Sequence, residues 1–179
     1  MAPRGFLDLD FDTVEQLDIG EILRVIGHLG HRATVVKERR ILKEKVVLYR
    51  IQIGRKGVGG VTIGIDVGLV RELPPHSRII YRSAYGIPAF EALVARPEFI
   101  LREKAEAFVR RSMRDLFDIY FLLGHILRGK CLPLKTQILN ALRLVMKRDW
   151  VRGIEALLLR VSVPRLEEVY SLISSVREC

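Results

Sequence analysis

Three groups of charged residues have the types and spacing needed for chemistry on phosphate groups. Asp8 and Asp10 stand two residues apart in a strand pattern, so both belong to one strand face. Asp66 is the one carboxylate of another strand pattern, and Lys104 and Asp115 lie in helical patterns farther along. Carboxylates that converge at a sheet edge suit Mg²⁺, which supports in-line phosphoryl displacement. A nearby lysine can neutralise the charge of a triphosphate.

The stretch 102–123 carries charges inside two apolar helix patterns, with a break near Ser112. Lys104 falls in the middle of the apolar stripe of the first helix. Asp115 shares the apolar face of the second helix, and Asp118 sits at the edge of that face. Buried charges are costly unless they are paired or used, so the pattern indicates either a functional site or structural ion pairs. The candidate pairs are Lys104–Asp115, Arg111–Asp115 and Arg114–Asp118.

Composition restricts the class of protein. With 179 residues, 49% of them apolar, the chain is long enough to bury a sizeable core as one compact domain. A net charge of +9 favours polyanionic partners, most commonly nucleic acid. Two cysteines, Cys131 and Cys179, make neither a disulfide framework nor a zinc site. We therefore expect reduced thiols and a cytoplasmic protein, with no apolar run long enough to span a membrane.

Hydrophobic periodicity predicts an α+β fold in which a mixed sheet precedes a helical half. Two-residue alternation predicts strands at residues 6–12, 33–37, 46–53, 61–67 and 79–82. Helical periodicity predicts helices at residues 13–29, 89–95, 102–112, 113–128, 133–147, 150–161 and 164–177. We expect a sheet region at residues 1–96 with flanking helices and a C-terminal helical bundle at residues 97–179, packed as one unit.

The charged motifs resemble those of a known family. Residues 4–10, RGFLDLD, are similar to the R-x-[ST]-x-D-[IL]-D segment of the AbiEii/AbiGii-type nucleotidyltransferase toxins. Residues 103–107, EKAEA, and residues 114–118, RDLFD, look like the E-K-x-x-A and R-D-x-x-D motifs of the same family. The order and separation of the motifs agree, and the resemblance covers residues 4–127.

This resemblance implies a DNA-polymerase-β-like nucleotidyltransferase fold with a helical C-terminal region. It implies Mg²⁺-dependent transfer of a nucleotide from an NTP to an RNA acceptor, which is tRNA in characterised members. It also implies that the protein is the toxin of a toxin–antitoxin pair, with a cognate antitoxin as a partner.

The resemblance also implies roles for individual residues. Asp8 and Asp10 would hold the metal, with Asp66 as a third carboxylate from the sheet. Lys104 would contact the triphosphate, and Asp115 would be an essential acidic residue that acts as the base for the acceptor hydroxyl. Asp118 belongs to the same catalytic motif. The residues expected to contact nucleotide or RNA are Lys104, Arg4, Arg111 and Arg114.

Two departures from the family pattern leave an alternative open. The family normally carries a Gly-Gly or Gly-Ser phosphate-binding motif upstream of the D-x-D segment. In the given sequence only three residues precede Arg4. Phe6 stands where the family has serine or threonine. The alternative is a truncated, catalytically degenerate relative that binds nucleic acid or a protein partner.

Overall fold

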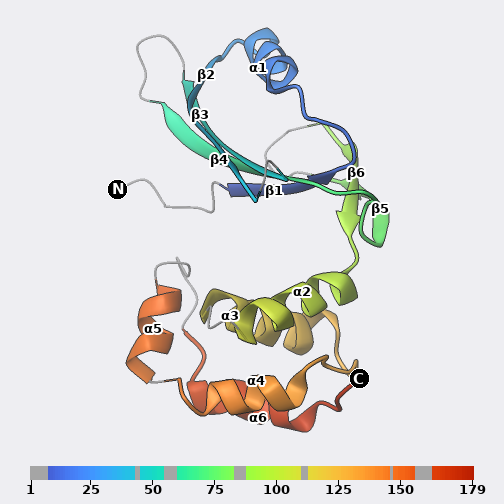
Figure 1. Cartoon of the computed structure of the whole chain (residues 1–179), viewed down its shortest axis with the longest axis vertical. Helices are drawn as coiled ribbons and strands as arrows, with labels where there is room; N and C mark the ends of the chain where they lie inside the picture. The colour runs from blue at the N-terminus through green and yellow to red at the C-terminus, as the bar shows by residue number, and fades with distance from the viewer. Residues whose placement is uncertain are drawn as a thin grey trace. The chain divides into compact units, whose positions relative to one another are not determined.

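The computed structural model contains two compact units, Met1–Pro74 and Pro75–Cys179 (Figure 1). The structure describes residues 8–42, 45–54, 60–82, 88–109, 113–145, 147–155 and 163–179. The units divide earlier than residue 96, where periodicity places the boundary. The hairpin of β5 (His76–Tyr81) and β6 (Phe90–Ala95) groups with the second unit because its two strands pair only with each other among the strands described.

The first unit is a four-stranded mixed sheet with one helix. Its strands lie in the order β1-β4-β3-β2, where β1 is parallel to β4 and the remaining pairs are antiparallel. The elements are β1 (Asp8–Thr13), α1 (Ile19–His28), β2 (Arg32–Ile41), β3 (Val46–Gly54) and β4 (Val61–Leu69). These strands confirm the alternation read from the sequence, although β2 extends farther than predicted.

Alternating residues of β3 and β4 form the core of the first unit. The side chains of Tyr49, Ile51, Ile65 and Val67 are buried on one face of the sheet. Leu23 of α1 packs against this cluster, so α1 covers that face (Figure 1). By alternation, the other face of β4 carries Gly64, Asp66 and Gly68.

The beginning of α1 differs from the prediction. A helix that starts directly after Thr13 is wrong, because the Thr13 hydroxyl instead donates to the carbonyl of Glu15, 2.7 Å away. The helix begins at Ile19, and the carboxylate of Asp18 accepts a hydrogen bond from the Gly20 amide at 2.8 Å. An aspartate at this position satisfies one of the unpaired amides of the first turn.

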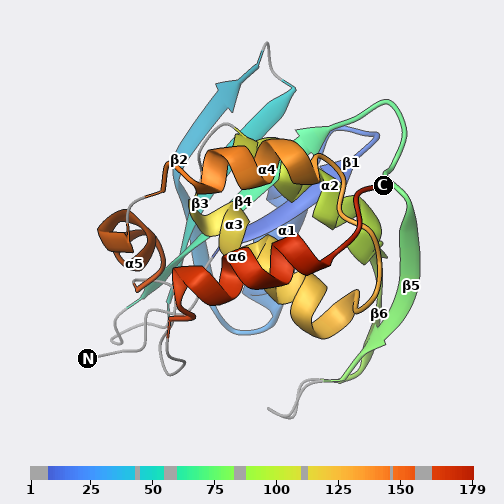
Figure 2. The same ribbon diagram turned by 90° about the horizontal axis from the view of Figure 1, so that it is seen from below.

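The second unit combines a β-hairpin with helices that surround a separate core. Its elements are β5 (His76–Tyr81), β6 (Phe90–Ala95), α2 (Pro97–Val109), α3 (Met113–Phe121), a π-helical turn (Leu122–Ile126), α4 (Lys135–Leu142), α5 (Lys147–Glu155) and α6 (Leu166–Ser175). Helix α2 contacts α3, and α4 contacts α6 (Figure 2). Trp150 and Phe108 are the largest fully buried side chains of this core.

The predicted helix at residues 89–95 is wrong, because residues Phe90–Ala95 form strand β6. The sequence FEALVA contains alanine, glutamate and leucine, which favour a helix locally. Pairing with β5 overrides that weak preference, and Phe90 lies opposite Tyr81 with ring centroids 5.1 Å apart. Within the part of the chain that the structure describes, no helix is long and apolar enough to cross a membrane.

The expectation of reduced thiols is also wrong, because Cys131 and Cys179 form a disulfide across a separation of 48 residues. The final residues run beside the segment before α4, where Leu132 donates its amide to the carbonyl of Arg177. The Glu178 carboxylate accepts hydrogen bonds from the amide and hydroxyl of Thr136 at 3.2 and 2.6 Å. A residue far along the chain therefore satisfies an amide in the first turn of α4.

Candidate functional site

Strands β1 and β4 bring two of the predicted carboxylate residues to adjacent positions. Asp10 pairs with Asp66 in the parallel register of these strands. Directly paired residues share a face of the sheet, and neighbouring strands lie about 4.8 Å apart. Because Ile65 and Val67 face the core beneath α1, Asp10 and Asp66 belong to the opposite face, which we call the acidic face. The backbone of Asp8 pairs with Gly64 in the same register.

A third carboxylate residue, Asp12, extends the acidic face along β1. Asp12 pairs with Gly68 of β4. A Cβ atom built on Gly68 would lie 2.7 Å from Asp12 Oδ1, so this carboxylate occupies the space that a side chain at Gly68 would need. Asp12 and Asp10 are both exposed to solvent. The acidic face therefore carries carboxylates on adjacent strands, and Gly64 and Gly68 flank Asp66 along β4.

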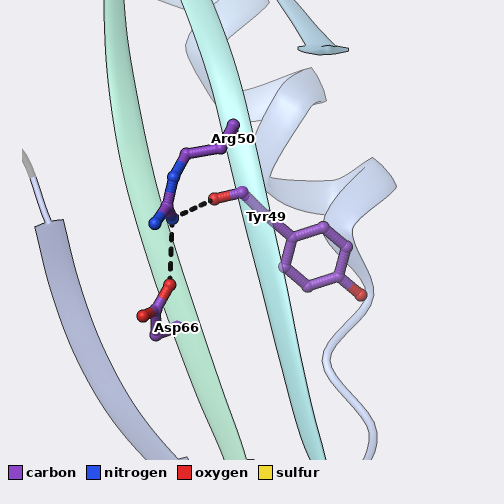
Figure 3. A network of polar contacts seen from close by, with 3 residues as sticks. All are labelled: Tyr49, Arg50 and Asp66. Carbon is purple, nitrogen blue, oxygen red and sulfur yellow. Dashed lines mark hydrogen bonds and ion pairs between the residues drawn. The ribbon is translucent and has the colours of Figure 1, made fainter. Parts of the chain in front are cut away.

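An arginine on β3 also belongs to the acidic face. Arg50 Nη1 donates to Asp66 Oδ1 and to the carbonyl oxygen of Tyr49, each at 3.0 Å (Figure 3). The side chains of Arg50 and Asp66 are 35% and 31% exposed, so the pair is only partly shielded from water. The sequence prediction of the site did not include Arg50. Alternation along β3 places Leu48, Arg50 and Gln52 on one face, which is the signal that identifies it.

Lys104 of α2 joins two carboxylates of α3. Its Nζ lies 3.1 Å from Asp115 Oδ1 and 2.8 Å from Asp118 Oδ2. Asp115 is the least exposed of the three, with 15% of its side chain exposed, against 34% for Lys104 and 41% for Asp118. Since Asp115 and Asp118 are three residues apart on a helix, they lie on neighbouring turns and one ammonium reaches both. We call these three residues the Lys104 cluster.

The electrostatics of the Lys104 cluster keep the lysine charged. Burial by itself would lower the pKa of Lys104, because an ammonium is less stable away from water. The hydrogen bonds and negative charges of Asp118 and Asp115 together outweigh burial, so the pKa of Lys104 is raised above its ordinary value. At neutral pH the cluster therefore contains an ammonium held between two carboxylate groups.

This geometry is compatible both with a functional site and with structural ion pairs at the charged residues of α2 and α3. A structural Lys104–Asp115 ion pair exists, and Lys104 also takes the place of Arg114 as the ion-pair partner of Asp118. Arg114 is exposed and forms no ion pair among the residues described. Arg4 and Arg111, also expected to bind nucleotide or RNA, lie outside the described residues.

The acidic face has donors that fit a hard cation. Carboxylates at paired positions of adjacent strands supply the oxygen ligands that Mg²⁺ prefers, and Mg²⁺ needs few of them when phosphate and water complete its shell. The residues whose side chains the structure describes contain no group of three histidine, cysteine or acidic residues able to hold a metal. The side chain of Asp8 is outside that set, so the metal site with Asp8, Asp10 and Asp66 stays a prediction.

Comparison with solved structures supports the fold. The structure resembles MenT4, a nucleotidyltransferase toxin from Mycobacterium tuberculosis H37Rv, with a TM-score of 0.56 and 16% sequence identity. The match covers 95% of this chain and 68% of that chain. At this identity the likeness shows the fold, which confirms the predicted nucleotidyltransferase-like α+β architecture.

Comparison at the sequence level identifies the family. No curated protein matches the chain. The profile of a family described as "Nucleotidyl transferase AbiEii toxin, Type IV TA system" matches residues 7–163, which is most of the chain. The match includes the acidic face and the Lys104 cluster. The chain therefore belongs to the AbiEii family of nucleotidyltransferase toxins.

Proposed function

We propose that the protein transfers a nucleotide from an NTP to tRNA in a Mg²⁺-dependent reaction, as the toxin of a toxin–antitoxin pair. The observation that carries this proposal is the register of β1 and β4, which sets Asp10 beside Asp66 on one face. Membership of the AbiEii family gives the reaction class. The net charge of +9 supports a polyanionic acceptor.

Asp8, Asp10 and Asp66 are the residues that would hold Mg²⁺. When bound, the metal supplies positive charge to phosphate oxygens and so stabilises the attacking and leaving oxygens of the displacement. The carboxylates position that charge on a rigid sheet, since β4 lies between β1 and β3 and is hydrogen-bonded to both.

The Lys104 cluster would supply charge and proton transfer. The hydroxyl oxygen of the acceptor attacks the α-phosphorus of the NTP, the bond between that phosphorus and the bridging oxygen of the β-phosphate breaks, and pyrophosphate leaves. The hydroxyl proton passes to the Asp115 carboxylate, and Lys104 neutralises triphosphate charge. Asp118 and Asp115 offset the effect of burial on the pKa of Lys104, so the residue stays an ammonium although it is partly buried.

The test is label transfer from each of the four α-labelled NTPs to total tRNA, with and without Mg²⁺. We expect transfer by the parent protein with Mg²⁺ and none by Asp115→Asn or Asp10→Asn. Asp149→Asn is the matched control, because Asp149 is an exposed carboxylate on α5 whose ion pair with Arg148 measures 3.5 Å. Equal transfer by Asp115→Asn and Asp149→Asn would contradict the role of Asp115. No transfer by a folded parent would favour the degenerate binding protein.

The proposed partners follow from the same reaction. NTPs and tRNA are both cytoplasmic, so we propose that location for the protein. We also propose that a cognate antitoxin neutralises it. Co-expression with the adjacent gene product, followed by growth measurement, tests this pairing, and growth inhibition that no neighbouring gene relieves would contradict it.

A further inference from the structure

We infer that Arg50 binds the triphosphate of the NTP and gives up its contact with Asp66 for one with phosphate when Asp66 engages the cation. This inference rests on the proposed function and adds a substrate-binding residue to it. It is based on the contact between Arg50 and Asp66 and on the position of both residues in the sheet.

Register places Arg50 of β3 in the same row of the sheet as Asp8 of β1, with β4 between them. Arg50 pairs with Gly64, and Gly64 pairs in turn with Asp8. One position along the same face, Leu48 pairs with Asp66, which pairs with Asp10. Because Gly64 has no side chain, no group of β4 in this row stands between the Arg50 guanidinium and β1. A phosphate held by the acidic face would meet this guanidinium.

The ion pair between Arg50 and Asp66 adds little to the stability of the fold, although both residues lie on inner strands of the sheet. Both partners are about one-third exposed, and a pair of this kind contributes at most about 1 kcal/mol. Arg50 donates a hydrogen bond to one oxygen of a carboxylate that the proposed function assigns to the metal. The pair therefore opposes cation binding at Asp66 while it keeps a phosphate-binding group next to that residue.

The chemistry of the guanidinium matches a triphosphate. Its planar set of donors binds phosphate oxygens in a bidentate manner, with more directional specificity than an ammonium. The carbonyl of Tyr49 accepts a hydrogen bond from the same Nη1 atom and so fixes the guanidinium on the acidic face (Figure 3). Because the Tyr49 side chain is buried in the core, this carbonyl is a rigid support.

The test measures two binding constants on the full chain, neither of which needs catalysis. The probes are Mg²⁺ alone and inorganic tripolyphosphate in excess Mg²⁺, both titrated by calorimetry. The variants are Arg50→Gln and Arg50→Lys. The matched control is Arg24→Gln, since Arg24 is an exposed arginine of α1 whose ion pair with Asp18 measures 3.7 Å in the same unit.

Arg50→Gln is expected to change the two constants in opposite directions. Mg²⁺ alone should bind about 3-fold to 10-fold more tightly because Asp66 loses its competing cation. Tripolyphosphate should bind about 10-fold to 100-fold more weakly because charge-assisted hydrogen bonds are lost. Arg50→Lys should lie between the parent and Arg50→Gln, and Arg24→Gln should leave both constants unchanged.

Two other results would distinguish failure of the inference about Arg50 from failure of the proposed function. If Arg50→Gln leaves both constants unchanged, or weakens both by one common factor, the inference about Arg50 is overturned and the proposed function stands. If the folded parent binds neither Mg²⁺ nor tripolyphosphate, the proposed function and this inference both fall. Arg50→Lys keeps the test decisive if Arg50→Gln does not fold, because it retains the charge but loses the bidentate geometry.

Discussion

Lys104 on α2 and Asp115 on α3 are joined at 3.1 Å between Nζ and Oδ1, although they are 11 positions apart in the chain. The contact links the two helices that carry the charges of the E-K-x-x-A and R-D-x-x-D motifs. Asp118 completes the cluster at 2.8 Å. Its three members therefore depend on one another for both structure and charge.

Replacement of Lys104 should affect stability and activity together. Lys104→Met leaves the mostly buried carboxylate of Asp115 without this ammonium, and we expect a loss of about 1–3 kcal/mol in the free energy of unfolding, with nucleotide transfer abolished. Lys130→Met is the control, because Lys130 is exposed and its ion pair with Glu98 measures 3.9 Å. Urea denaturation measures the free energy of unfolding of both variants. Equal effects on stability would show that the cluster is an ordinary surface ion pair.

The Lys104 cluster should also give a specific pH dependence at the alkaline end. The pKa of Lys104 is raised above its ordinary value of 10.5 in the folded protein. Its contribution to stability is therefore complete below the unfolded pKa and is lost as pH rises through the folded pKa. The difference in urea midpoint between the parent and Lys104→Met should be constant at neutral pH and shrink above about pH 10.5. A difference that does not change up to about pH 12 would contradict the raised pKa.

Gly153 should be needed for the packing of α5 on α3. A Cβ atom at this position would lie 2.7 Å from Cβ of Met113, the first residue of the helix that carries Asp115. We expect Gly153→Ala to destabilise the protein by about 1–3 kcal/mol because the core has no space for the methyl group. Gly27→Ala on α1 is the control, because its Cβ would meet nothing within 4 Å and alanine favours a helix. Thermal melts should show opposite shifts; the same upward shift in both would refute the steric argument.

The disulfide should stabilise the second unit. Cys131 and Cys179 close a long loop, and such a bond contributes about 2–4 kcal/mol. We expect Cys131→Ser to lower the urea midpoint, and a reducing agent to lower that of the parent but not that of the variant. Two reactive thiols in the folded, unreduced protein would contradict the bond.

Much of the sheet could be predicted because its strands carry one-sided patterns. In β3 and β4 apolar residues alternate with others, and burial of Ile51, Ile65 and Val67 follows that alternation. Strand β6 could not be predicted in this way, since its exposed residues lack a one-sided pattern and pairing with β5 decides its conformation. The start of α1 was predicted wrongly because threonine and aspartate are both common capping residues, and the structure uses Asp18 where the helix pattern was read from Thr13.

The residue types of the candidate site, and the strand or helix that carries each, follow from local sequence patterns. Alternation set Asp10 and Asp12 on one strand face, and helical spacing set Asp115 and Asp118 on neighbouring turns. The partners of these residues follow from the three-dimensional fold: Asp10 lies beside Asp66, Arg50 contacts Asp66, Lys104 lies between two carboxylates, and Cys131 is bonded to Cys179. Local periodicity fixes which face a residue occupies, whereas strand order and helix packing, which join distant segments, fix what it meets there.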